Sequence, residues 1–120
     1  MSPLSGLLHR LTASREEIDA DEERRTSRLL GATPVAEVAP RRRGRVAGVI
    51  SSLTYRPQGE APALVARLFD GTGSVDLVFL GRHEVPGIEP GRHLVAEGMV
   101  AEHAGRPVIF NPAYELVGGE

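Results

Sequence analysis

The segment from residue 63 to residue 79 constrains the fold most, because two runs with alternating apolar side chains flank a strong turn signal. A period of two is typical of a β-strand that buries one face. The turn D-G-T-G at residues 70–73 supplies an Asp acceptor and two glycines that adopt positive φ without strain. We therefore predict a β-hairpin with strands at about 63–69 and from residue 74. The side chains expected on its buried face are Leu64, Ala66, Leu68, Val75, Leu77 and Phe79.

Three further strands are predicted from the same alternation. The first, at about 43–55, contains Gly48 where the strand bends sharply, and the fourth, at about 93–101, has a second bend at Gly98. A fifth strand begins at residue 108 and is kinked at Asn111-Pro112. The polar stretch 81–91 is expected to form one helical turn that caps an end of the sheet. By parity Phe79 and Phe110 are both expected in the core, whereas Tyr55 is compatible with either side.

These strands predict an all-β protein, a five-stranded antiparallel OB-fold Greek-key barrel with an added N-terminal α-helix. A chain of 120 residues is long enough to close one core. We divide it into a flexible lead-in at 1–13, a helix and extended connector at 14–43, the barrel at 44–117, and a tail at 118–120.

The added helix is predicted from its end signals. Ser14 stands three residues before Glu17, which is the spacing of a capping box. Acidic residues gather in the early turns and arginines in the last turns, the order that complements the helix dipole, and Gly31 is placed for a left-handed C-cap. Few apolar residues share one face of this helix, so we expect it to contact the barrel over a small area.

Four motifs recur in a known superfamily. They are V-x-G-x-I at residues 46–50, L-F-D-G-T-G at 68–73, G-x-x-L-x-x-E-G-x-V at 91–100 and N-P at 111–112. Together they resemble the OB-fold superfamily that includes anticodon-binding domains of class II tRNA synthetases and helicase wedge domains. The added helix, residues 81–92 and the ending N-P-x-Y-E-L are similar to small stand-alone OB-fold proteins of high-GC bacteria.

The resemblance implies a nucleic-acid-binding scaffold. In the synthetase domains an aromatic residue on strand two, an Arg before the turn Asp and a Gln on strand three read the anticodon. Those positions hold Val65, Phe69 and Asp76 in this chain, and none of the three matches. What the resemblance implies is therefore the barrel and a general nucleic-acid-binding role, without anticodon recognition.

Arginines and aromatic residues near the predicted strands are the candidates for binding single-stranded DNA or RNA. Cations neutralise phosphates and flat side chains stack on bases. Arg67 and Phe69 are expected to point outward on the second strand, the face that OB domains use. Other arginines lie just before the first strand and in the two loops that flank this face. The predicted nucleic-acid-binding residues are Arg41, Arg42, Arg43, Arg45, Arg56, Arg67, Phe69 and Arg106.

Two of these assignments have structural alternatives of similar weight. Asp76 should share a face with Arg67, so the two could form a cross-strand ion pair that cancels the charge of the arginine. The arginines at 41–45 could instead keep the start of a strand solvated and discourage edge pairing.

Catalysis and metal binding are not expected. The chain has no cysteine, and its four histidines are scattered singly, without a spacing that suits a metal site. Asp70 has a sufficient role in the turn, and the glycines around it are too few to cradle a phosphate. We therefore predict no enzyme activity, no cofactor and no small-molecule substrate.

The main alternative function is a protein–protein interaction adapter that uses the barrel and the charged helix. Acidic early turns and arginine-rich late turns give the helix surface both signs of charge, which suits electrostatic pairing with another protein. The sequence shows neither a leader peptide nor a membrane-spanning run, so we expect a cytoplasmic protein without a membrane partner.

Overall fold

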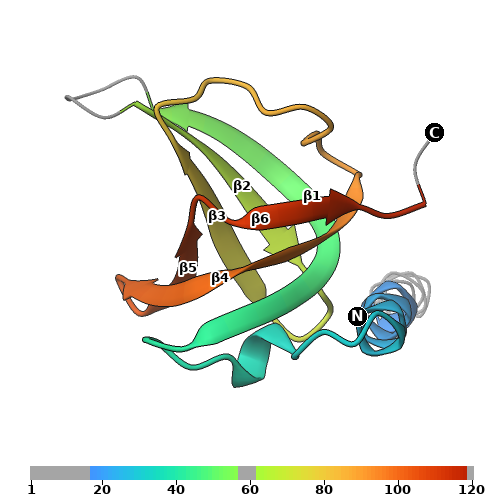
Figure 1. Cartoon of the computed structure of the whole chain (residues 1–120). Coiled ribbons are helices and arrows are strands. Elements are labelled where there is room, and N and C mark those ends of the chain that lie inside the picture. Colours follow the sequence, from blue (N-terminus) through green and yellow to red (C-terminus); the bar gives the residue numbers. More distant parts are fainter. Residues whose placement is uncertain (1–16, 57–61, 119–120) are drawn as a thin grey trace, which may run out of the picture.

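The computed structural model describes residues 17–56 and 62–118. A helix at residues 17–29 precedes a short 3-10 helix and six strands (Figure 1). The predicted lead-in at 1–13, the Ser14 cap and the last two residues of the tail lie outside the described residues. The remaining elements are η1 (Val35–Glu37), β1 (Arg43–Arg56), β2 (Ala63–Phe69), β3 (Ser74–Leu80), β4 (His93–His103), β5 (Arg106–Phe110) and β6 (Ala113–Leu116).

Strand β1 closes the sheet on itself because it pairs with two neighbours. Its first half pairs with β4, from Arg43 opposite Met99 to Val49 opposite His93. Its second half pairs with β2, as far as Arg56 opposite Ala63, with a register shift between Ile50 and Ser52. The remaining order, β2-β3-β5-β4, completes a ring of strands that gives a barrel-like shape (Figure 1).

The prediction of five strands that are all antiparallel is wrong in two respects. Strand β3 pairs with β5 in parallel, from Asp76 opposite Val108 to Val78 opposite Phe110. The last extended segment is also divided into β5 and β6, which pair with different halves of β4. Asn111 adopts a positive φ of 49° and precedes a proline, which cannot donate to a strand ladder, so the chain turns at this point.

The core lies inside the ring and confirms the predicted buried face of the β2–β3 hairpin, since all six of its expected side chains are buried. Val35 of η1 covers the core beside the start of β3, and Val85 and Ile88 of the following loop cover it beyond the end of β3. Two local predictions are wrong. The connector is not fully extended, because it contains η1, and residues 81–91 form turns without a helix.

The bend of β1 requires glycine at position 48. A Cβ atom there would lie 2.2 Å from the carbonyl oxygen of Phe69, which is too close for any side chain. The close approach lies where β1 leaves β4 for β2, since Gly48 pairs with Leu94 and the next residue, Val49, already pairs with Phe69. Gly48 therefore allows one strand to serve two neighbours.

We predict that Gly48→Ala lowers the free energy of unfolding by about 3 kcal/mol, because the backbone must move to remove the clash. The control is Gly73→Ala, since a Cβ at that position would meet nothing closer than Val35 Cγ1 at 3.5 Å. Urea denaturation of both variants measures the difference. Equal losses would show that the close approach at Gly48 is not the constraint.

Asp70 connects the β2–β3 turn to the segments that precede the sheet. Its fully buried carboxylate accepts from Thr72 N–H at 2.9 Å, Thr72 Oγ1 at 2.6 Å and Gly73 N–H at 3.2 Å through Oδ1. Its other oxygen, Oδ2, accepts from Val35 N–H at 2.8 Å. Oδ2 thus satisfies a buried backbone donor, and Oδ1 satisfies two backbone donors of the turn that are partly buried.

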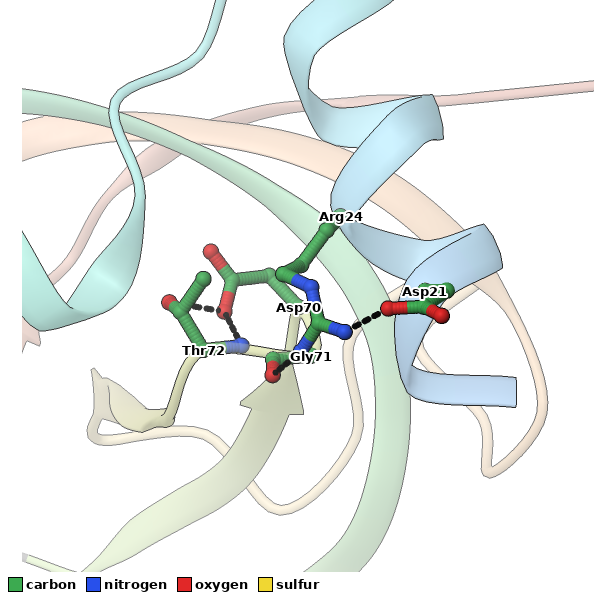
Figure 2. Close-up of polar contacts among 5 residues, drawn as sticks. All are labelled: Asp21, Arg24, Asp70, Gly71 and Thr72. Carbon is green, nitrogen blue, oxygen red and sulfur yellow. Dashed lines mark hydrogen bonds and ion pairs between the residues drawn. The ribbon is translucent and has the colours of Figure 1, made fainter. Parts of the chain in front are cut away.

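The helix at residues 17–29 contacts the same turn (Figure 2). Arg24 Nη1 donates to the carbonyl oxygen of Gly71 at 2.7 Å, while Arg24 also pairs with Asp21 one turn earlier on the helix. A second contact joins Glu23 Oε1 to His93 Nε2 at 2.9 Å. The helix therefore meets the sheet through a few polar contacts, and its predicted left-handed C-cap is confirmed by the φ of 71° at Gly31.

We predict that Asp70→Asn lowers the free energy of unfolding by about 2 kcal/mol, since an amide nitrogen cannot accept and one set of backbone donors loses its partner. Asp21→Asn removes the same charge from an exposed helix position and should cost less than about 0.5 kcal/mol. Thermal and urea unfolding of the pair provide the comparison. A loss at Asp70 no larger than that at Asp21 would contradict the role of this carboxylate.

Candidate functional site

The outer face of β2, β3 and β5, opposite to the core, brings three charged side chains together. Arg67 of β2 stands directly across from Asp76 of β3, and the next strand, β5, begins at Arg106. Arg67 Nε donates to Asp76 Oδ1 at 3.0 Å, and Arg106 Nη2 lies 3.8 Å from the same oxygen. We call these three residues the Asp76 cluster. The cross-strand pair between Arg67 and Asp76, one of the two interpretations of Arg67 that the sequence left open, is present.

The Asp76 cluster carries a net positive charge that is open to solvent. The side chain of Asp76 is 12% exposed, while those of Arg67 and Arg106 are 40% and 44% exposed. One carboxylate therefore faces two guanidinium groups, and each of these keeps donors that the carboxylate does not use, because a guanidinium has five N–H donors. The arrangement can bind an anion at the surface.

Beside the Asp76 cluster the outer face is apolar. Ala63, Val65, Val78 and Val108 form a second buried cluster on this side of the sheet, and each is 5 or 6% exposed. Val65 stands opposite Val78, which in turn stands opposite Phe110. We call these four residues the apolar floor. Its exposed edge consists of Leu80, which is 44% exposed, and Phe110, which is 49% exposed.

The prediction that Phe110 lies in the core is wrong. Ile109 occupies the core position of β5 and is fully buried, so Val108 and Phe110 point to the outer face. Val108, Ile109 and Phe110 are all apolar, so these three residues alone do not show which side of the strand faces the core. Packing fixes it instead, because Ile109 fits over Gly98 of β4, where an added Cβ would lie 2.7 Å from Ile109 Cγ2.

Phe69 lies at the end of β2 with the parity of Arg67, half-buried and opposite Ser74. The outer face therefore holds two aromatic residues, Phe69 and Phe110, where the sequence predicted one. Tyr55 is exposed at the end of β1 and packs edge-on against His83, with ring centroids 6.0 Å apart.

The arginines at positions 41–45 lie on a different part of the surface. They precede and begin β1, where Arg43 stands opposite Met99 of β4 and its Nε lies 3.6 Å from Glu97 Oε1. Arg41 donates its backbone N–H to the carbonyl oxygen of Val100 at 2.7 Å. Strand β4 therefore separates these arginines from Arg106 on β5, and the structure does not join them to the Asp76 cluster as one continuous patch.

Arg56 is exposed at the last position of β1 and stands opposite Ala63, the first residue of β2. It lies beside the apolar floor, on the side away from Arg67. The structure thus brings together Arg67 and Arg106 from the predicted set, with Phe69 on the same face. It places Arg56 at the far end of the floor.

The remaining polar residues within the described part of the chain do not gather into a metal site, since no group of three His, Asp or Glu residues has suitable geometry there. His83 packs on Tyr55 and His93 contacts Glu23, while His103 stands opposite Arg106. None of the helices in the described residues is long and apolar enough to cross a lipid bilayer.

Sequence reasoning missed Phe110 and the contact of Arg106 with Asp76. Both follow from the parallel pairing of β3 with β5, which joins residues more than thirty positions apart in the chain. One local signal was available. Arg106, Val108 and Phe110 alternate with Pro107 and Ile109, and an arginine at the first of these positions indicates that this set faces solvent.

Comparisons with known proteins give a likeness of fold. No protein-family model and no curated protein matches the chain. Among solved structures, an OBody bound to hen egg-white lysozyme is similar, with 18% sequence identity and a TM-score of 0.56. The match covers 73% of this chain and 92% of that chain. At this identity the likeness concerns the barrel-like fold alone.

We predict that Arg67→Gln changes the free energy of unfolding by less than about 1 kcal/mol, because the Arg67 side chain is 40% exposed and Arg106 stays beside the Asp76 carboxylate. Thermal unfolding at neutral pH measures this change. A loss above about 2 kcal/mol would show that Arg67 is chiefly a structural residue. The result also establishes whether variants at this position are fit for binding experiments.

Proposed function

We propose that the barrel-like sheet is an OB-type Greek-key barrel and that its outer face binds single-stranded nucleic acid weakly, with little sequence preference. Three features support the fold assignment. One long strand is shared by two neighbours, the order β1-β2-β3-β5-β4 returns to β1, and an OBody has a similar structure. In such barrels the face of strands two and three binds oligonucleotides.

The observation that carries the functional proposal is the meeting of cations and an aromatic ring on this face. Arg67 and Arg106 offer half-exposed guanidinium groups, and Phe110 on β5 presents an exposed ring. Phosphates bind guanidinium groups, and bases of every type stack on aromatic rings. A single strand that crosses β2, β3 and β5 would meet both kinds of group.

The small number of exposed aromatic rings and arginines on this face also sets the expected affinity for nucleic acid. One base stacked on an aromatic side chain contributes about 1 to 3 kcal/mol, and here one aromatic ring is well exposed while Phe69 is half-buried. Contacts with phosphates carry no sequence information and weaken as salt rises. Binding is therefore weak and strongly dependent on salt, and Arg41 and Arg42 could add phosphate contacts only if the strand continues past β4.

We predict that Phe110→Ala and the double variant Arg67→Gln/Arg106→Gln each weaken binding of fluorescent single-stranded DNA or RNA by about tenfold or more at low salt. The matched control is Arg25→Gln/Arg28→Gln, which removes the same charge from exposed positions on the helix. Fluorescence anisotropy at low and physiological salt measures the affinity. A control that weakens binding as much as the face variant would show that only the overall charge matters.

The apolar floor favours a second candidate, a protein-interaction adapter. Leu80 and Phe110 are large exposed apolar side chains next to Val78, and such surfaces often mark contacts with other proteins. This apolar surface lies on β3 and β5, and it does not include β1, the strand that contains Gly48. If the folded protein binds neither DNA nor RNA at low salt, the nucleic-acid proposal fails and the adapter becomes the function to test.

A further inference from the structure

Asp76 is the one acidic residue on the outer face of β2, β3 and β5, and its position sets it apart from Asp70. The alternating outward positions of these three strands are otherwise neutral or basic. Asp70 accepts backbone N–H groups and so stabilises a turn, whereas the interactions found for the Asp76 carboxylate involve the guanidinium groups of Arg67 and Arg106. The carboxylate of Asp76 is thus directed at the two cations that a ligand phosphate would need.

A phosphate group that binds Arg67 through Nε would need the donor that the Asp76 carboxylate already uses, while other N–H donors of the guanidinium group stay free. Arg67 Nε already donates to Asp76 Oδ1 at 3.0 Å, and Arg106 Nη2 approaches that oxygen at 3.8 Å. Guanidinium groups bind carboxylate and phosphate oxygens in the same planar geometry. A phosphate that takes the Nε of Arg67 must displace Oδ1, and it would then lie beside a carboxylate of like charge that is only 12% exposed.

We propose that Asp76 is an internal competitor for the anionic ligand of this face and that it limits the affinity of the protein for single-stranded nucleic acid. This inference rests on the proposed function and assigns a specific residue to its regulation. The carboxylate holds the two guanidinium groups over the strands while the face is empty. It then lowers the affinity for a phosphate, because the existing ion pair with Arg67 must be broken before the phosphate can bind through Nε.

The test is Asp76→Asn, which keeps the shape of the side chain and removes its charge. We expect it to tighten binding of a fluorescent oligothymidylate or oligouridylate of about 16 nucleotides, the upper end of the site sizes of OB domains. The expected gain is about two- to fivefold at physiological salt, the worth of one partly exposed ion pair. The slope of log affinity against log salt should steepen by about 0.7, the value for one additional phosphate on a single strand.

The matched control is Glu22→Gln, which makes the same change of net charge at an exposed position of the helix. A general effect of charge would appear equally in both variants, whereas competition at the Asp76 cluster raises affinity in Asp76→Asn alone. Thermal unfolding verifies that both proteins are folded. If Asp76→Asn is unstable, Asp76→Thr replaces it, because threonine suits an outward strand position.

Each outcome separates the inference from the proposed function. If the wild type binds and Asp76→Asn binds more weakly, Asp76 positions the arginines for binding and the inference is wrong. If the wild type binds and the two variants are equal in affinity, only net charge matters and the inference is again wrong. If the folded wild type and Asp76→Asn both fail to bind at low salt, the proposed function fails as well. Binding by Asp76→Asn alone would support the inference that Asp76 competes with the ligand, and would contradict the proposed function of the protein with Asp76 in place.

Discussion

Strand β1 hydrogen-bonds to β4 along its first half and to β2 along its second half, and the ring of strands exists because of this shared strand. The change of partner needs a sharp bend, and the bend brings the backbone of Phe69 to a distance that only glycine at position 48 tolerates. Without the bend the sheet would remain open and its core would be exposed on one side. The outer face takes its curvature, and hence the spacing of its side chains, from the same closure.

Two aspartates near each other in the chain have opposite physical roles. Asp70 is buried and satisfies backbone donors, so its contribution is to the stability of the turn and of the segments attached to it. Asp76 lies on the outer face, is itself largely buried and pairs with two partly exposed arginines, so its partners are charged side chains rather than the backbone of a turn. A carboxylate that accepts from the backbone serves the fold. One that accepts from guanidinium groups at the surface is available to compete with a ligand.

The outer face combines an apolar floor with a charged cluster because neighbouring strands contribute different residue types to adjacent rows. Val65 and Val78 stand in one row with Phe110, and Arg67 and Asp76 stand in the next row with Val108. Bases and phosphates alternate along a single strand in a similar way, with apolar and charged parts side by side. This correspondence supports the proposal that the face binds nucleic acid, and the apolar half alone would suit the alternative proposal of a protein partner.

The sequence by itself determined the elements whose signals are local. The D-G-T-G turn, the alternation around it and the glycine at 48 predicted the hairpin, its buried face and the bend of β1, and the pair of Arg67 with Asp76 was one of two interpretations that the hairpin register allowed. Only the tertiary structure decided what depends on distant partners. The parallel pairing of β3 with β5 brought Arg106 to Asp76, and the fit of Ile109 over Gly98 turned Phe110 outward. The physical reason is that periodicity reports which side of a strand is apolar, whereas packing between strands decides which side faces the core when both are apolar.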